Sequence, residues 1–299
     1  MIHSQRQWYS DMERALLLSG KSSATRESYL RSVRQLVDHF HKDPREITER
    51  ELEDYFLFRR TESRWKPATL RLCYAGIKFY FRTVLDRSWR LFSILHAEDE
   101  RTLPVVLTQE EVTRILSHVT TFHNRVFLST VYACGLRLGE ALALTVNDID
   151  AQAMLIHVRR GKGAKDRTVP LPQHTLSLLR RYWLTHKHPS MIFPALGRGR
   201  KDGHTATVHM NRASVQGAFL RARKAAGVTR PHISIHTLRH SYATHLLEAG
   251  LNIRFIQRAL GHRCLETTVQ YLHLTGKGQA DAYRIINAVM READHARCS

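Results

Sequence analysis

The sequence predicts a mainly α-helical protein with a small β-sheet or hairpin: a helical N-terminal domain followed by an α+β domain. Apolar residues recur at helical spacing over most of the 299 residues. Two short runs of strand-forming residues, MLIHVRR (154–160) and RTVPLP (167–172), flank the glycine-containing segment GKGAKD (161–166). That arrangement is typical of a β-hairpin.

The domain boundary is predicted from a loss of periodicity. Segment 96–106 clusters acidic residues, contains Pro104 and breaks the helical pattern. We therefore expect domains at 1–98 and 107–299, joined by a linker at 99–106.

About four helices are expected in the N-terminal domain. Segment 25–40 carries an apolar stripe, Thr48 and Glu51 form a capping box, and Pro67 can open a further helix. The positions expected to face the core are Tyr29, Leu30, Val33, Leu36, Val37, Phe40, Leu52, Tyr55, Phe56, Leu70, Tyr74, Ile77 and Phe81.

The C-terminal domain is expected to restart with a capping box formed by Thr108 and Glu111. Gly135 should end a buried helix that begins near residue 121. The other expected elements are helices starting at 136, at 174–186 and at 214–227, an edge strand at 191–194, two helical segments within 234–273 and a tail helix at 279–299.

The charge is strongly basic and unevenly distributed. Lys and Arg number 46 against 27 Asp and Glu, a net charge of +19. Residues 1–100 carry a net +3 and residues 101–299 a net +16. A basic second half indicates a polyanionic partner, most often nucleic acid, and the alternative is a merely soluble basic surface.

Other classes of protein are disfavoured. The cysteines (73, 134, 264 and 298) form no CxxC pair, which argues against a zinc ribbon and fits a reducing compartment. The 19 histidines include no metal-ligand spacing, so no metal is expected. With no apolar run long enough for a membrane span, we expect a soluble cytoplasmic protein associated with the nucleoid.

Segment 234–273 carries the candidate chemistry. His236 and Arg239 share one helical face, His262 follows a glycine, and Tyr271 comes nine residues later. Cationic and neutral donors suit a phosphate, and a phenol can attack one. His240, His245 and His273 are expected to be structural or surface residues.

Two further segments extend this candidate site. Arg137 and Glu140 are either a surface ion pair or a phosphate-binding arginine held by a carboxylate, and the apolar flanks favour the second. Lys162 lies between glycines in the hairpin turn, where a solvated lysine is the ordinary case. The GxxxxGK[ST] pattern of a P-loop is absent.

These motifs together resemble the tyrosine recombinase/phage integrase family, in its Xer-like form. The motifs are CGLRLGEAL (134–142), GKGAKDRTVPL (161–171), HTLRHSYATHLLEAG (236–250) and LGHRCLETTVQYLH (260–273). Segment 23–40 is similar, less specifically, to the family's DNA-clamping core-binding domain. Carried over position by position, the family's catalytic residues are Arg137, Lys162, His236, Arg239, His262 and Tyr271, with Glu140 in support.

The resemblance implies a site-specific DNA recombinase that works through a covalent 3′-phosphotyrosine. Tyr271 would be the nucleophile and Lys162 would protonate the leaving 5′ oxygen. His236 would accept or share the tyrosine proton, and His262 and the two arginines would bind the phosphate. No cofactor or metal is implied.

The implied partners are double-stranded DNA with recombination sites and further copies of the chain, as a tetramer in synapsis. A partner recombinase or an accessory DNA-bending protein is a further candidate, and the tail helix is a candidate for exchange between protomers. Three alternatives stay open at this point: a DNA-binding regulator without cleavage, a type IB topoisomerase and a zinc hydrolase.

Overall fold

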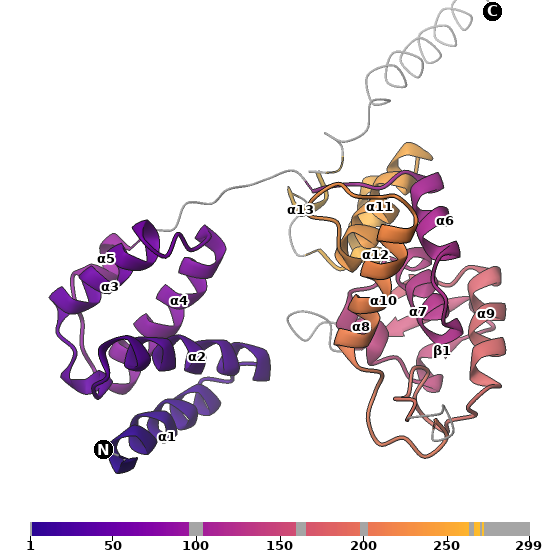
Figure 1. Cartoon of the computed structure of the whole chain (residues 1–299). Helices are drawn as coiled ribbons and strands as arrows, with labels where there is room; N and C mark the ends of the chain where they lie inside the picture. Colours follow the sequence, from indigo (N-terminus) through magenta and orange to yellow (C-terminus); the bar gives the residue numbers. More distant parts are fainter. Residues whose placement is uncertain are drawn as a thin grey trace, which may run out of the picture. The chain divides into compact units, whose positions relative to one another are not determined.

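The structure is a computed structural model that describes residues 2–95, 104–159, 166–197, 203–262, 266–269 and 271. It divides into two compact units, Met1–Thr102 and Leu103–Ser299 (Figure 1). Both units are helical and a small antiparallel sheet lies in the second, which confirms the predicted fold class. The domain limits 1–98 and 107–299 and the linker at 99–106 remain a proposal. None of the helices in the described part is long and apolar enough to cross a membrane.

The N-terminal unit is a helical bundle around one apolar core. Helix α2 packs on α4, and Gly76 of α4 permits the approach, because a Cβ there would lie 3.0 Å from the Tyr29 Cα. Its elements are α1 (Ile2–Leu18), α2 (Ser23–Phe40), the 3-10 turn η1 (Pro44–Glu46), α3 (Glu49–Thr61), α4 (Pro67–Phe79), the π-helical turn η2 (Tyr80–Val84) and α5 (Leu91–Ile94).

Helix α1 is the element that the sequence pattern missed. Its charged residues interrupt the apolar ones, but Trp8, Met12 and Leu16 recur every fourth position and all three are buried. They therefore form one stripe of the helix, on the side that faces the core.

The second unit places helices around a three-stranded antiparallel sheet of order β1-β2-β3. Its elements are α6 (Gln109–Ser117), α7 (Phe122–Ala133), α8 (Leu138–Leu142), η3 (Val146–Asp148), β1 (Ile149–Asp150), β2 (Leu155–Val158), β3 (Arg167–Pro170), α9 (Gln173–Trp183), α10 (Arg212–Ala225), α11 (Ile235–Glu248), α12 (Ile253–Leu260) and α13 (Glu266–Val269). The predicted capping boxes are present at Thr48 and Thr108.

The predicted edge strand at 191–194 is wrong. Met191 and Pro194 make only isolated bridges, to Thr145 and His209. The Met191 amide is instead satisfied locally, by donating to His188 Nδ1 at 2.8 Å. A short apolar run does not by itself determine a strand ladder.

Helix α11 is central to the second unit, where it packs against α6, α7 and α12. The chain entering this unit is tied to it, because the Leu107 amide donates to Ser241 Oγ at 2.9 Å. His245 lies between the Leu107 carbonyl and the Tyr132 hydroxyl, at 2.9 and 2.8 Å. These buried contacts hold α11 in place, and α11 carries two of the candidate residues, His236 and Arg239.

Candidate active site

The C-terminal end of α12 is the point at which the candidate residues meet. The last carbonyl groups of a helix have no intrahelical partners and lie at the negative end of the helix dipole. Here three consecutive carbonyls, at 259–261, accept hydrogen bonds from three guanidinium groups. The donors are Arg167 at 2.8 Å, Arg239, and Arg137 at 3.4 Å.

Arg239 is the most deeply buried member of this cluster, with 1% of its surface exposed. Nη1 donates to the Gly135 carbonyl at 2.7 Å and Nη2 to the Leu260 carbonyl, so the ends of two helices hold the guanidinium plane. Burial, followed by the charge of Arg137, lowers its pKa to about 9, and the group stays charged at neutral pH. Two of its five N–H donors are used in this way.

Arg137 and Glu140 form a partly buried pair at the start of α8. The Arg137 amide and Nη1 both donate to the Glu140 carboxylate, each at 2.7 Å. The Glu140 side chain is only 8% exposed and that of Arg137 is 25% exposed. The pair is therefore not a solvated surface ion pair, and Arg137 keeps an accessible edge.

Arg167, at the start of β3, is a member of the cluster that the sequence interpretation missed. Its two Nη groups donate to the two oxygens of Glu140, each at 2.8 Å, and its Nε donates to the Ala259 carbonyl. Burial alone would raise the pKa of Glu140, but the hydrogen bonds and charge of Arg167, with those of Arg137, lower it to about 2.

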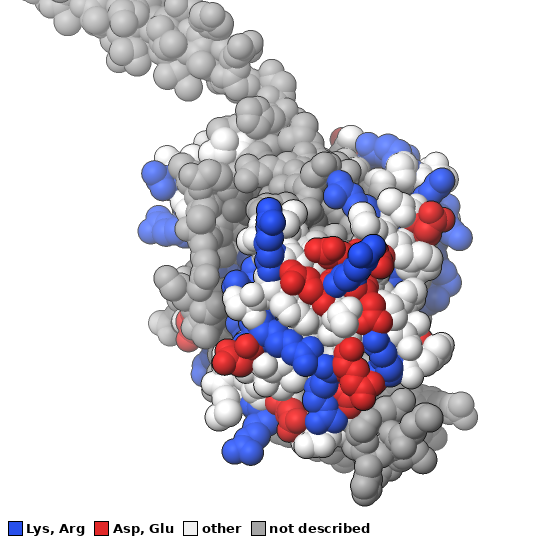
Figure 2. Space-filling model, turned by 90° about the vertical axis from the view of Figure 1, so that its left-hand side faces the viewer, with Lys and Arg blue, Asp and Glu red and all other residues white. Residues whose placement is uncertain are grey.

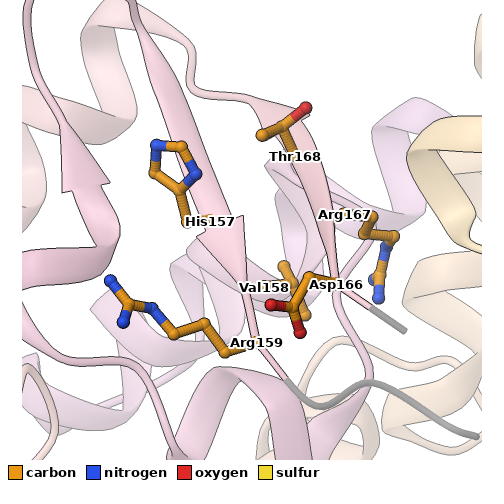
Figure 3. Close-up of a pocket in the computed structure, with 6 residues that line it drawn as sticks. All are labelled: His157, Val158, Arg159, Asp166, Arg167 and Thr168. Carbon is orange, nitrogen blue, oxygen red and sulfur yellow. The ribbon is translucent and has the colours of Figure 1, made fainter. Parts of the chain in front are cut away.

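The sequence feature that could have identified Arg167 is the alternation of inward and outward side chains along the strand. Arg167 pairs with the buried Val158 in the β2–β3 register and precedes the buried Val169 by two residues. Side chains two apart share a face of a sheet, so Arg167 points to the inner side. Figure 3 shows it directed away from His157 and Arg159, the neighbours with which it lines an open pocket.

Tyr271 is fully buried at the other side of the α12 terminus. Its ring packs with Ala243, Ile256 and Leu260, and the His262 ring stacks on it with centroids 6.2 Å apart. Thr268 fixes this region twice, because its carbonyl accepts from the Tyr271 amide and its hydroxyl contacts His262 Nδ1 at 2.9 Å.

The histidine closest to the nucleophile candidate was not expected there. His240 Nδ1 lies 2.7 Å from the Tyr271 hydroxyl, although His240 was expected to be structural or on the surface. His236, one turn earlier on α11, meets His240 edge to face with centroids 4.5 Å apart. The i, i+4 spacing of the two histidines places them on the same face of the helix, and this feature of the sequence could have linked His240 to the site.

Six of the seven candidate residues therefore form one connected set. Contacts run from Arg137 through Glu140 and the α12 terminus to His262 and Tyr271, and on through His240 to His236. Lys162, His273 and the tail helix at 279–299 lie outside the described residues.

The chemistry of this set is that of anion binding beside a phenol. Three guanidinium groups face one carboxylate, which leaves an excess of positive charge. Burial lowers the pKa of His262 to about 3 and that of His240 to about 4, with the charge of Arg239 adding to both effects. Both rings are thus neutral at pH 7. In the described part of the chain no group of three or more His, Cys, Asp or Glu side chains is placed to hold a metal ion.

Comparison with known families matches both parts of the chain. A model of the phage integrase family matches residues 105–277, and a model of the phage integrase N-terminal SAM-like domain matches residues 8–91. The chain belongs to the phage integrase family.

The similarity of this phage integrase family member to its relatives extends over most of the chain. A Sinorhizobium fredii protein with an integrase/recombinase name is 36% identical over 251 residues, covering 84% of this chain and 79% of that protein. Tyrosine recombinase XerA of Thermococcus kodakarensis is 34% identical and covers 89% and 90%. A lambda integrase tetramer bound to a Holliday junction shares the fold at 19% identity, with a TM-score of 0.70 and coverage of 89% and 76%.

The resemblance inferred from the motifs is thus confirmed at the level of the family and the fold. The roles assigned to individual residues of this integrase remain predictions.

Proposed function

We propose that the protein is a site-specific DNA recombinase that cuts and rejoins DNA through a covalent link between Tyr271 and a 3′ phosphate. The observation that carries this proposal is a tyrosine hydroxyl bonded to a neutral imidazole, in the same connected cluster as three buried or partly buried arginines. Membership of the phage integrase family supports it.

Each strand cleavage is an exchange of one phosphodiester for another. The Tyr271 oxygen bonds to phosphorus, the bond to the 5′ oxygen breaks, and that oxygen leaves with a proton from a protein acid, for which Lys162 is the candidate. Rejoining reverses these steps with a 5′ hydroxyl from another strand. The phosphodiester energy is kept in the phosphotyrosine, so neither ATP nor a metal ion is required.

Arg137 and Arg239 are proposed to bind the non-bridging oxygens of the phosphate. Negative charge grows on these oxygens in the transition state, where preorganised donors have their largest effect. Both guanidinium groups are already held by carbonyl and carboxylate acceptors, so little reorganisation is needed on binding. Glu140 and Arg167 position Arg137 without touching DNA.

A complete recombination joins two DNA sites and exchanges four strands. We propose that four copies of the chain assemble for this purpose, which the shared fold with the lambda integrase tetramer supports. An accessory DNA-bending protein, a second recombinase and exchange of the tail helix at 279–299 remain proposals of the same kind.

The decisive experiment is trapping of the covalent intermediate. Duplexes selected from a random pool for binding would supply the site, and a nicked form of that site prevents religation. The intact protein should then yield a denaturation-resistant protein–DNA adduct, whereas Tyr271→Phe should bind with unchanged affinity and yield none.

Three outcomes would contradict the proposal. Absence of an adduct from the unaltered protein would favour a DNA-binding regulator, and an adduct from Tyr271→Phe would place the nucleophile elsewhere. Relaxation of supercoils without any joining of two sites would favour a type IB topoisomerase instead.

A further inference from the structure

We propose that His240 is a catalytic residue, the base that accepts the Tyr271 hydroxyl proton as this oxygen attacks the DNA phosphate. The inference rests on the proposed function of Tyr271. It moves the proton-accepting role from His236, to which the family resemblance assigned it, to its neighbour one helical turn later.

The first support is the position of the two atoms. His240 Nδ1 lies 2.7 Å from the Tyr271 hydroxyl oxygen, within the range for direct proton transfer. His236 packs against the His240 ring, with an interplanar angle of 83°. His240 thus stands between His236 and the hydroxyl.

The second support is that both partners are held in place. His240 lies in the middle of α11. The preceding residue, Arg239, donates hydrogen bonds to two helix-end carbonyls. The tyrosine ring is held by an apolar pocket and by the stacked His262 ring. Tyr271 is buried in the DNA-free protein, so DNA binding has to expose its hydroxyl. Helix α11 holds His240, the proposed proton acceptor, in place during this change.

The third support is the charge state of the ring. The groups that face His240 are His236 and Arg239 on its own helix, and His262 and Tyr271 from the chain after α12. Burial, followed by His236 and Arg239, keeps the pKa of His240 near 4, so the free imidazole is available to accept a proton at pH 7. A bound phosphate adds negative charge beside the arginines and raises the basicity of the ring at the moment of attack.

The proposed step balances. The hydroxyl proton passes to His240 Nδ1 as the bond from the tyrosine oxygen to phosphorus forms, and the 5′ oxygen departs with a proton from a separate acid. When the strand is rejoined, the imidazolium returns its proton to the departing phenolate.

The test compares His240→Asn with a matched control, His174→Asn, at an exposed position on α9. The asparagine amide oxygen stands near the place of Nδ1 and can accept a hydrogen bond, but it cannot take up the proton. Adduct formation on the nicked site should slow by about 10²- to 10⁴-fold in His240→Asn. DNA affinity should be unchanged, and the control should react at the original rate.

A second arm separates proton transfer from positioning. A fluorinated tyrosine incorporated at 271 has a more acidic phenol, which ionises without a base. It should restore most of the rate lost in His240→Asn, because the missing step is then no longer needed. If fluorination leaves the rate of His240→Asn unchanged, His240 is a positioning residue and the inference is overturned. The inference is also overturned if the fluorinated tyrosine restores the rate of His236→Asn and not that of His240→Asn.

Failure of this inference differs from failure of the proposed function. A normal rate in His240→Asn would overturn the assignment of the base, while the Tyr271→Phe experiment would still stand. If His240→Asn does not fold, the ¹⁵N shift of His240 in the unaltered protein decides. An unprotonated Nδ1 supports the inference and a protonated Nδ1 overturns it.

Discussion

Glu140 is the residue on which the arrangement of the cluster depends. It accepts hydrogen bonds from Arg137 and Arg167 and lies 3.8 Å from Arg239. One carboxylate among three guanidinium groups offsets part of their mutual repulsion without cancelling their charge. The cluster is therefore assembled in the DNA-free protein and keeps an excess of positive charge.

Replacing Glu140 by Gln should lower the free energy of unfolding by about 3–5 kcal/mol, because it leaves buried guanidinium groups without their counter-charge. Urea denaturation measures this. The matched control is Glu27→Gln, whose partner Arg31 and own side chain are 62% and 73% exposed; it should cost under about 1 kcal/mol. Equal losses in the two variants would contradict the buried-pair interpretation.

The unaltered protein and Glu140→Gln should also differ in how their stability responds to acid. The pKa of Glu140 is about 2 in the folded protein, below the ordinary value of 4.5. A depressed carboxyl pKa stabilises the fold above the unfolded value and loses this effect as the pH falls through the folded value. The stability advantage over Glu140→Gln should therefore be full above about pH 5 and shrink toward pH 2.

Arg167 and His240 are the two residues of the cluster that the sequence did not assign to the candidate site. Arg137, Arg239, His262 and Tyr271 were proposed because they occupy the positions of the family's catalytic residues. Arg167 and His240 lie in the same motifs but at other positions. Arg167 was treated as part of the hairpin and His240 as a structural or surface residue. Arg167 contacts a carbonyl 92 positions away and His240 contacts a hydroxyl 31 positions away. Local periodicity does not report such contacts.

At the scale of elements, the end of α12 depends on one glycine. Gly261 has φ +65°, a conformation that favours glycine, and a Cβ there would lie 2.8 Å from Arg167 Cδ. Arg167 is held by three hydrogen bonds and cannot easily move aside.

The variant Gly261→Ala should therefore lose about 2–4 kcal/mol of stability, from backbone strain plus overpacking, and form the adduct more slowly. Gly227→Ala is the matched control, with φ +70° at the end of α10 but open space around its Cβ; it should show the strain of about 1–2 kcal/mol alone. Thermal or urea unfolding gives both values, and equal losses would show that the contact with Arg167 does not matter.

The elements that the sequence predicted well are those with local determinants. The side chains of Thr48 and Thr108 form the caps expected of them, and the hairpin strands pair as expected. Other elements were misjudged. The charges of α1 obscured its buried stripe. The segment at 191–194 makes one isolated bridge at each end, to Thr145 and to His209, in place of a continuous strand.

At the scale of the whole molecule, the two parts differ in charge. The face of the N-terminal unit seen in Figure 2 carries acidic and basic side chains interspersed, in keeping with the net +3 of residues 1–100. The net +16 of residues 101–299 makes the part that holds the candidate site the main source of attraction for DNA.

DNA binding should accordingly weaken steeply with salt, because each neutralised phosphate releases counterions. If six to ten phosphates are contacted, the Kd should rise by about 10³- to 10⁵-fold between 50 and 200 mM salt. Fluorescence anisotropy with Tyr271→Phe measures this without interference from a covalent adduct. An affinity that changes little over this range would contradict the electrostatic account, and would mean that the basic excess serves some purpose other than holding the DNA backbone.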